Sequence, residues 1–210
     1  MNGLVHPHLE RIDRAIDALR AERHRISGAV PTVAYQGAPG AFSEDAARAL
    51  AGEAAVLQPL NTLEDVFQAL TMGVAEFAVI PVENSLAGAV PRAADLIRRF
   101  GCRVMAEHSL RIAHALVGCP GATIETVREA ASHPVALAQC RQFFAARPHI
   151  AEVTAFDTAG SVAAMMAAGN TASAAIASER AAALYGGVVL LSEIQDRRDN
   201  FTRFVVLATS

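Results

Sequence analysis

The sequence predicts an α/β protein built around a mostly parallel sheet. From Thr32 onward, short apolar runs alternate with stretches in which apolar residues recur at helical spacing. This order is typical of strand–helix–strand units, in which helices cover a parallel sheet. Hydrophobic residues make up 52% of the 210 residues, which is enough to bury a substantial core without a metal or a disulfide.

Short strands and capped helices are expected in order from Thr32. The predicted strands cover residues 33–35, 56–57, 77–82, 102–106, 112–117, 129–131, 153–156, 174–177, 188–191 and 204–207. Helix starts are recognised by Ser or Thr caps and helix ends by glycine. The predicted helices begin at Ser43, at Thr62 (through 70), near residue 90 (to 100), at Ser132 (to 146, with Pro134 in its first turn), at Thr158 (to 168) and at Ser178 (to Gly186).

Residues 1–31 form a separate predicted segment, a helical extension. Apolar residues approximate helical spacing from Leu9 to Ile26, and Gly28 and Pro31 end this helix. Two interpretations stay open. The helix serves packing or oligomerisation, or it is a frayed extension.

Composition and charge exclude several partners. Eighteen Lys and Arg against 21 Asp and Glu leave a net charge of −3, without the basic footprint of a nucleic-acid or anionic-membrane binder. The N-terminus has no cationic segment followed by an apolar stretch, and no run of about 20 apolar residues could span a bilayer. Cys102, Cys119 and Cys140 lack zinc or redox spacing, which indicates a reducing compartment. We therefore expect a cytoplasmic protein.

Polar loops follow several predicted strands, at the edge where parallel sheets bind ligands. They cover residues 37–43, 83–85, 132–134, 157–158 and 177–178. Helix starts in these loops offer free N–H groups and a positive dipole end that suit a carboxylate or phosphate. The pattern favours a small-anion site, and the alternative is that the Ser and Thr residues are ordinary helix caps.

Other chemistries lack their usual motifs. The chain has neither GxGxxG nor GKS/T for a nucleotide, and no GxSxG elbow of a serine hydrolase. His108, His114 and His133 lack Cys or acidic partners at metal-ligand spacing, so we expect no metal. Cys140, among apolar neighbours, is expected in the core and not as a nucleophile.

Five motifs in order resemble those of prephenate dehydratases. They are VAYQGAPGAFS at 33–43, PVENSLAG at 81–88, SHPVALAQC at 132–140, AAIAS with LYG at 174–178 and 184–186, and DNFTRF at 199–204. The similarity runs from about Thr32 to Thr209. It implies two α/β lobes like a type 2 periplasmic binding protein, with the active site in the cleft between them. The first lobe would comprise 32–110 plus 198–210, and the second 111–197.

The resemblance implies the decarboxylating dehydration of prephenate to phenylpyruvate, a carbon–oxygen lyase reaction of phenylalanine biosynthesis. It implies no metal or organic cofactor. Family members often dimerise, so a homodimer is expected.

The resemblance also implies roles for individual residues. Thr202 matches the family's catalytic threonine and would hydrogen-bond to the departing hydroxyl, while Asn84 and Gln139 match polar residues important for turnover. Arg203 would bind a substrate carboxylate, and the alternative for it is a structural ion pair. The resemblance places further residues at the substrate, namely Ala41, Phe42, Ser43, Glu83, Ser85, Ser132, Ser178 and Phe204. Of these, the two phenylalanines are expected to form the cleft wall or the core.

Three departures from the family pattern leave alternatives open. Ala41 stands where many members have Thr, which removes one possible substrate contact. The GAPGAFS and ENSLAG forms resemble arogenate dehydratases, so arogenate is an alternative substrate. Members usually continue into an ACT domain that binds phenylalanine, and this chain stops at Ser210. Either it is a piece of a longer protein or it lacks that feedback site, and no ACT domain is expected within it.

A non-catalytic module that binds small anions with the same fold is the competing class of function. The presence of Thr202, Asn84 and Gln139 together argues against it, because a binding protein needs no catalytic threonine.

Overall fold

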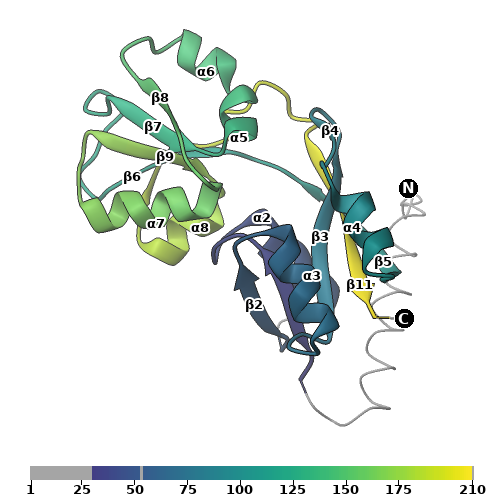
Figure 1. Ribbon diagram of the computed structural model, residues 1–210. Coiled ribbons are helices and arrows are strands. Elements are labelled where there is room, and N and C mark those ends of the chain that lie inside the picture. Colours follow the sequence, from purple (N-terminus) through teal and green to yellow (C-terminus); the bar gives the residue numbers. More distant parts are fainter. Residues whose placement is uncertain (1–29, 53, 210) are drawn as a thin grey trace, which may run out of the picture.

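Two β-sheets, each covered by helices on both faces, make up the protein (Figure 1). The computed structural model describes residues 30–52 and 54–209. The helix expected between Leu9 and Ile26 lies outside the described residues. Within them, no helix is long and apolar enough to cross a membrane.

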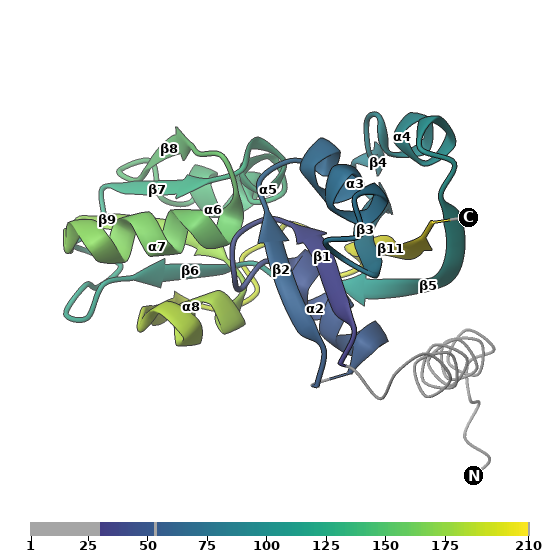
Figure 2. The ribbon, with the colours of Figure 1, turned by 60° about the horizontal axis from the view of Figure 1, so that its bottom comes forward.

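The first sheet is formed by the two ends of the described chain. Its strand order is β2-β1-β3-β11-β5, with β4 paired to β3. The strands are β1 (Thr32–Gln36), β2 (Val56–Leu60), β3 (Phe77–Asn84), β4 (Gly88–Ala89), β5 (Arg103–Arg111) and β11 (Phe201–Ala208), and the helices are α2 (Phe42–Ala51), α3 (Leu63–Thr71) and α4 (Ala93–Arg99). Successive side chains of a strand point to opposite faces of the sheet, so the sheet has a separate hydrophobic core on each face. Ala34 and Ile80 pack under α3 and α4, whereas Val33 and Val79 pack under α2. Figure 2 shows α2 and α3 on opposite faces of this sheet.

The second sheet is formed by the middle of the chain, in the order β10-β6-β9-β7-β8. The strands are β6 (Ala115–Gly118), β7 (Glu129–Ser132), β8 (Ala151–Thr154), β9 (Ser173–Ala177) and β10 (Val188–Leu191), and the helices are α5 (Pro134–Ala138), α6 (Arg141–Ala145), α7 (Thr158–Ala168) and α8 (Glu179–Tyr185). Leu116 and Ile176 face α5 and α6, and Val117 and Ala175 face α7 and α8.

The expectation of mostly parallel sheets is wrong. In the described residues four strand pairings are parallel and five are antiparallel. Two of the antiparallel pairings follow from the path of the chain: it leaves the first sheet after β5, builds the second, and returns as β11. The returning strand inserts between β3 and β5 and runs antiparallel to both. Local periodicity contains no signal for such a return.

Two crossovers join the sheets and touch each other (Figure 1). The first links β5 to β6 through residues 112–114, and the second links β10 to β11 through residues 192–200. The Ile112 N–H donates to the carbonyl of Asn200 at 2.8 Å. The strand predicted at 112–117 is therefore confirmed only from Ala115, because residues 112–114 belong to the crossover.

The single helix predicted from Ser132 to residue 146 is in fact two short helices, α5 and α6. Asp196, from the second crossover, causes the break. Its N–H donates to the Gln139 carbonyl at 2.7 Å, and its carboxylate accepts from the N–H groups of Arg141 and Gln142 at 3.1 and 2.8 Å. Gln139 is thereby held at a corner between the helices, with its side chain free to reach the first sheet.

The observed helix caps agree with the predicted ones at some helices and differ at others. The caps predicted at Thr62 and Ser178 are confirmed, each accepting from a backbone N–H three residues on. Three predicted starts are wrong by one residue. The N-caps are His133 before α5 and Asp157 before α7, in place of Ser132 and Thr158, and α2 begins at Phe42 in place of Ser43. The strand predicted at 153–156 lies two residues earlier, as β8.

The loop after β1 packs against the second sheet. Ser178 donates through Oγ to the Gly40 carbonyl at 3.1 Å, and the Tyr185 hydroxyl donates to the Pro39 carbonyl at 2.9 Å. Gly40 has φ +88°, and a Cβ there would lie 3.0 Å from the Ala181 Cα. Only glycine allows both the turn and this close approach.

A buried carboxylate reinforces that contact. Glu44 of α2 is 4% exposed and accepts from the Gly40 N–H at 2.6 Å and from Arg48 and Arg180 at 2.7 Å each. Arg180 lies on α8, so the ion pair joins the two sheets' helices. Burial alone would raise the pKa of Glu44, but the hydrogen bonds from Arg180, Gly40 and Arg48 outweigh it and lower the pKa to about 2.

We expect Glu44→Gln to lower the free energy of unfolding by about 1–3 kcal/mol at pH 7, because the partly buried guanidinium groups of Arg48 and Arg180 lose this anionic partner. The pKa of Glu44 is depressed in the folded state, so its contribution is present above pH 4.5 and is lost as pH falls toward 2. Urea unfolding at pH 7 and pH 3 should show the variant and wild type converging in acid. The control Asp95→Asn, at an exposed pair with Arg98, should change the free energy by less than about 0.5 kcal/mol. A difference independent of pH would contradict this assignment.

Candidate active site

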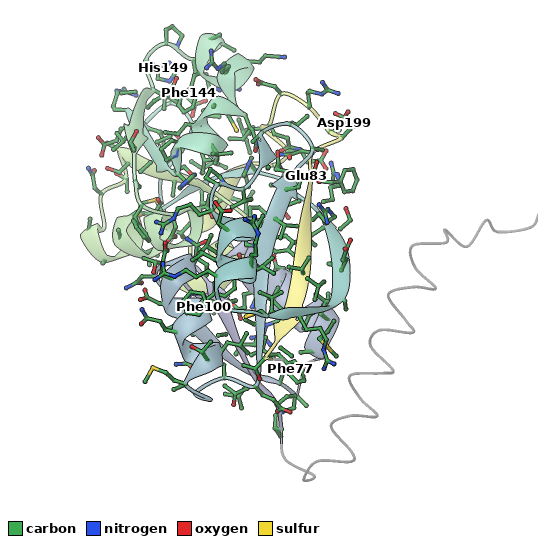
Figure 3. The ribbon with its side chains drawn as sticks, turned by 45° about the vertical axis from the view of Figure 1, so that its right-hand side comes forward. Phe77, Glu83, Phe100, Phe144, His149 and Asp199 are labelled. Atoms are coloured by element: carbon green, nitrogen blue, oxygen red, sulfur yellow. The ribbon has the colours of Figure 1, made fainter. Side chains whose placement is uncertain are left out.

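The ends of β3 and β11 bring Asn84 and Thr202 directly opposite each other. Asn84 donates through Nδ2 to Thr202 Oγ1 at 3.0 Å and to Asn200 Oδ1 at 2.8 Å. Figure 3 shows that β3 runs from Phe77, at its far end, to Glu83 at the end nearest the second sheet. The pair thus lies where the two sheets meet.

The amide of Asn84 can take only one orientation. Its Oδ1 accepts from the backbone N–H groups of Leu86 and Ala87 at 3.0 and 2.9 Å, which is the Asx turn that asparagine favours at the end of a strand. A backbone N–H can only donate, so Oδ1 must face the turn and Nδ2 must face Thr202 and Asn200.

Gln139 reaches this pair from the second sheet. Its Nε2 donates to Asn84 Oδ1 at 3.3 Å, and its Oε1 accepts from Asn200 Nδ2 at 2.9 Å. His114, on the first crossover, lies 3.0 Å from the same Oε1 through Nε2. One network therefore ties together a strand of the first sheet, a helix corner of the second and both crossovers.

Thr202 is left with a donor that no described residue uses. Its hydroxyl oxygen accepts from Asn84, and its hydrogen makes no bond within residues 30–52 and 54–209. The residue is 9% exposed. A hydroxyl that accepts one hydrogen bond is polarised toward donating another, so the geometry suits an oxygen of a bound molecule.

Ser85 stabilises the chain beside the network. Its Oγ donates to the Asp199 carbonyl and accepts from the Phe201 N–H, each at 3.0 Å. Figure 3 labels Asp199 near Glu83, where the second crossover enters β11. The hydroxyl predicted to contact substrate is thus engaged in holding the approach to Thr202.

Arg203 and Glu83 lie on the other face of the sheet. Neighbouring residues of a strand point to opposite faces, so Arg203 points away from Thr202. Its guanidinium pairs with Glu83 at 2.9 Å and with Glu107 at 3.5 Å. This geometry corresponds to the structural ion pair considered as the alternative for Arg203.

The remaining predicted positions are placed around the network or away from it. Ser132 is fully buried and donates to the Ile176 carbonyl at 2.6 Å, and the Ser178 hydroxyl is engaged with Gly40. Ala41, the N-cap of α2, packs into the core of the second sheet, and Phe204 packs into that of the first. Ser43 makes no hydrogen bond to the network. Phe42 does approach the network, with its ring edge-on to His114 at 5.7 Å between centroids.

Three residues of this site carried no role in the sequence analysis: Asn200, His114 and Gln195. Asn200 is fully buried, and its position inside DNFTRF was the available signal. His114 and Gln195 are 2% and 6% exposed and lie on different crossovers. Buried polar side chains in connecting segments are unusual, but nothing in the sequence shows that these segments are buried.

Nucleophilic and metal chemistry find no support in the described residues. Burial raises the pKa of Cys140 to about 12, so its thiol stays protonated, and its predicted core placement is confirmed. His133 accepts from the Val135 N–H through Nδ1 and so caps the first turn of α5. No group of three or more His, Cys, Asp or Glu in this part of the chain could hold a metal ion.

The fold and this site define an α/β protein of two mixed sheets with a polar junction between them. The sequence matches the prephenate dehydratase family over residues 33–210. The chain belongs to that family.

Known relatives and structures agree with this family. "Arogenate dehydratase/prephenate dehydratase 6, chloroplastic" of Arabidopsis thaliana is 40% identical over 208 residues, which cover 99% of this chain and 50% of that protein. The chain spans about half the length of the curated relatives it matches.

Two solved structures share the fold. A prephenate dehydratase from Arthrobacter aurescens in complex with L-Phe has a TM-score of 0.77 and 30% identity over 85% of this chain and 60% of its own. GqqA, described as a quorum-quenching acylase, also has a TM-score of 0.77, with 35% identity over 85% of this chain and 64% of its own.

We expect Asn200→Asp to destabilise the protein by about 3 kcal/mol at pH 8, because a buried carboxylate would face Gln139 Oε1 without a donor. Burial would raise the pKa of the new carboxyl in the folded state, so the loss should shrink as pH falls and the group protonates. Urea unfolding at pH 8 and pH 5 measures this. The exposed control Asn61→Asp should change the free energy by less than about 0.5 kcal/mol at both pH values. Equal destabilisation at both pH values would contradict the assignment in which Asn200 donates to Gln139 Oε1.

Proposed function

We propose that this chain converts prephenate to phenylpyruvate by decarboxylating dehydration, a step of phenylalanine biosynthesis. One observation carries the proposal: Thr202 presents a hydroxyl donor that no described residue uses, and Asn84 holds its oxygen at the junction of the two sheets. Membership of the prephenate dehydratase family supports it.

The reaction requires the protein to stabilise negative charge on one departing oxygen. When the bond from the ring to the carboxylate breaks, its electron pair enters the ring and carbon dioxide departs. The carbon–oxygen bond on the opposite ring carbon then breaks, and the hydroxyl leaves as water with one added proton. The product ring is aromatic, which supplies the driving force, so the protein must mainly orient the ring and stabilise negative charge on the departing oxygen.

Each network residue has a place in this scheme. Thr202 donates its hydrogen bond to the departing oxygen. Asn84 holds the Thr202 oxygen and aims its hydrogen outward, and Gln139 holds Asn84 from the second sheet. A donor held in position before the reaction needs no reorganisation as charge develops.

Arogenate is the second candidate substrate. The relative from Arabidopsis thaliana carries both activities in its name, which favours testing the two substrates together. The ring chemistry is the same, and the product would be phenylalanine. Comparing kcat/KM for prephenate and arogenate with the purified protein decides between them, and no product from either would overturn the proposed function.

An acylase activity like that named for GqqA finds less support at this site. Acyl transfer needs an activated nucleophile, usually Ser or Cys hydrogen-bonded to a His. No such pair exists among residues 30–52 and 54–209, where the His114 side chain bonds to Gln139 and His133 accepts from a backbone N–H.

We further propose two lobes, 32–110 plus 198–210 and 111–197, in a cytoplasmic homodimer. The residues that form each sheet support the lobe boundaries. Three free cysteines are in keeping with a reducing compartment, although the Arabidopsis relative is named chloroplastic. Analytical ultracentrifugation tests the dimer.

We expect Thr202→Ala to lower kcat by roughly 10²–10³-fold, the effect of losing one preorganised donor to a developing anion. Stopped assays of phenylpyruvate formation measure it. Thr202→Ser keeps the hydroxyl and should retain most of the activity. Full activity in Thr202→Ala would remove Thr202 from the mechanism.

Arg203→Gln should leave KM within about threefold of wild type, because its guanidinium pairs with Glu83 and Glu107 on the opposite face from Thr202. A charge-assisted contact to a substrate carboxylate would instead be worth about 10-fold or more in KM. Steady-state kinetics distinguish the two outcomes, and a rise of that size would show that Arg203 turns to bind substrate.

A further inference from the structure

We propose that His114 is a positioning residue, a neutral imidazole whose Nε2–H holds the Gln139 amide in the one orientation that keeps Thr202 free to donate. The inference rests on the proposed function for its kinetic consequence. Its structural part stands on the hydrogen bonds alone.

The direction of every bond in the network follows from the backbone. Asn84 Oδ1 must accept from the turn that follows it, so the group of Gln139 that meets this oxygen is its NH2. Gln139 Oε1 is then left to face Asn200 Nδ2 and His114 Nε2. Because an amide oxygen only accepts, His114 Nε2 must carry a proton.

The other nitrogen of the ring is empty. His114 Nδ1 is buried and has no hydrogen-bond partner among residues 30–52 and 54–209, and His114 is 2% exposed. Its described neighbours are neutral: Gln139 beside Nε2, Gln195 accepting from the His114 backbone N–H at 2.8 Å, and the ring of Phe42. A proton on Nδ1 would be a buried donor without an acceptor, which is unfavourable. The favoured species is therefore the neutral Nε2–H tautomer.

Burial of His114 has the effect expected for such a group. It lowers the pKa of the imidazole, and the bond to Gln139 only partly offsets it. His114 thus stays neutral in the folded protein near pH 7.

Removing the His114 donor takes away one of the two hydrogen bonds that Gln139 Oε1 accepts, so the amide is held less firmly against turning over. A reversed amide would set its oxygen against Asn84 Oδ1 and its NH2 against Asn200 Nδ2. Asn84 and Asn200 would then shift to avoid these contacts, and the Thr202 oxygen would lose its fixed donor. Small misplacements of a catalytic group reduce the rate of the chemical step more than they weaken substrate binding.

Paired variants test the donor itself. His114→Met removes it at similar size, and His114→Gln restores an N–H near the position of Nε2. We expect kcat to fall roughly 10- to 100-fold in His114→Met with KM within about threefold, and to stay within about threefold of wild type in His114→Gln. His108→Met is the matched control, because His108 also has a buried, unpartnered Nδ1 but takes no part in the network. It should keep kcat within about twofold.

Nitrogen-15 NMR of the wild-type histidines gives a readout independent of turnover. We expect the His114 signals to show a protonated Nε2 and a bare Nδ1, with His114→Gln identifying the resonances by their loss. An Nδ1–H tautomer would overturn the proposal, and so would wild-type kcat in a folded His114→Met or an equal loss in both His114 variants. If the wild-type protein turned over neither substrate, the proposed function would fail. The NMR measurement of the His114 tautomer would still test the hydrogen-bond assignment.

Discussion

The orientation of a single side-chain amide, that of Asn84, governs the polar junction between the two sheets. Its oxygen is committed to two backbone N–H groups, whose polarity cannot reverse. The other directions follow: Gln139 donates to Asn84 Oδ1, and Asn84 Nδ2 donates to Asn200 and Thr202. The Thr202 hydrogen is therefore left without an acceptor among the described residues. Because these groups are at least partly buried, reversing one amide would set like groups against each other, so the network has one low-energy arrangement.

This junction exists only because the chain returns to the first sheet as β11. Thr202 and Asn84 are 118 residues apart in the sequence and become neighbours when β11 pairs with β3. The loop after β1 makes a second connection, since Gly40 packs on α8 and Glu44 pairs with Arg180. Both connections require both sheets to be formed, so the proposed site and the tertiary fold depend on each other.

Much of the protein could be predicted from local pattern. Alternating apolar runs located nearly all the strands, and the caps at Thr62 and Ser178 followed from side chains that bond a backbone N–H three residues away. The family resemblance singled out Asn84, Gln139 and Thr202, and the structure brings all three into one network. These features succeed for a common reason: each is encoded by a few adjacent residues.

The sequence by itself determined the α/β class, the order of the elements and the three polar residues at the centre of the junction. Only the tertiary structure decided the mixed sheets, the break at Gln139 imposed by Asp196, the pairing of Arg203 with Glu83, and the burial of His114. Each of these depends on partners that are distant in the sequence. Hydrophobic periodicity and capping report on neighbours along the chain, whereas the burial and partner of a polar group are set by what the folded chain packs against it.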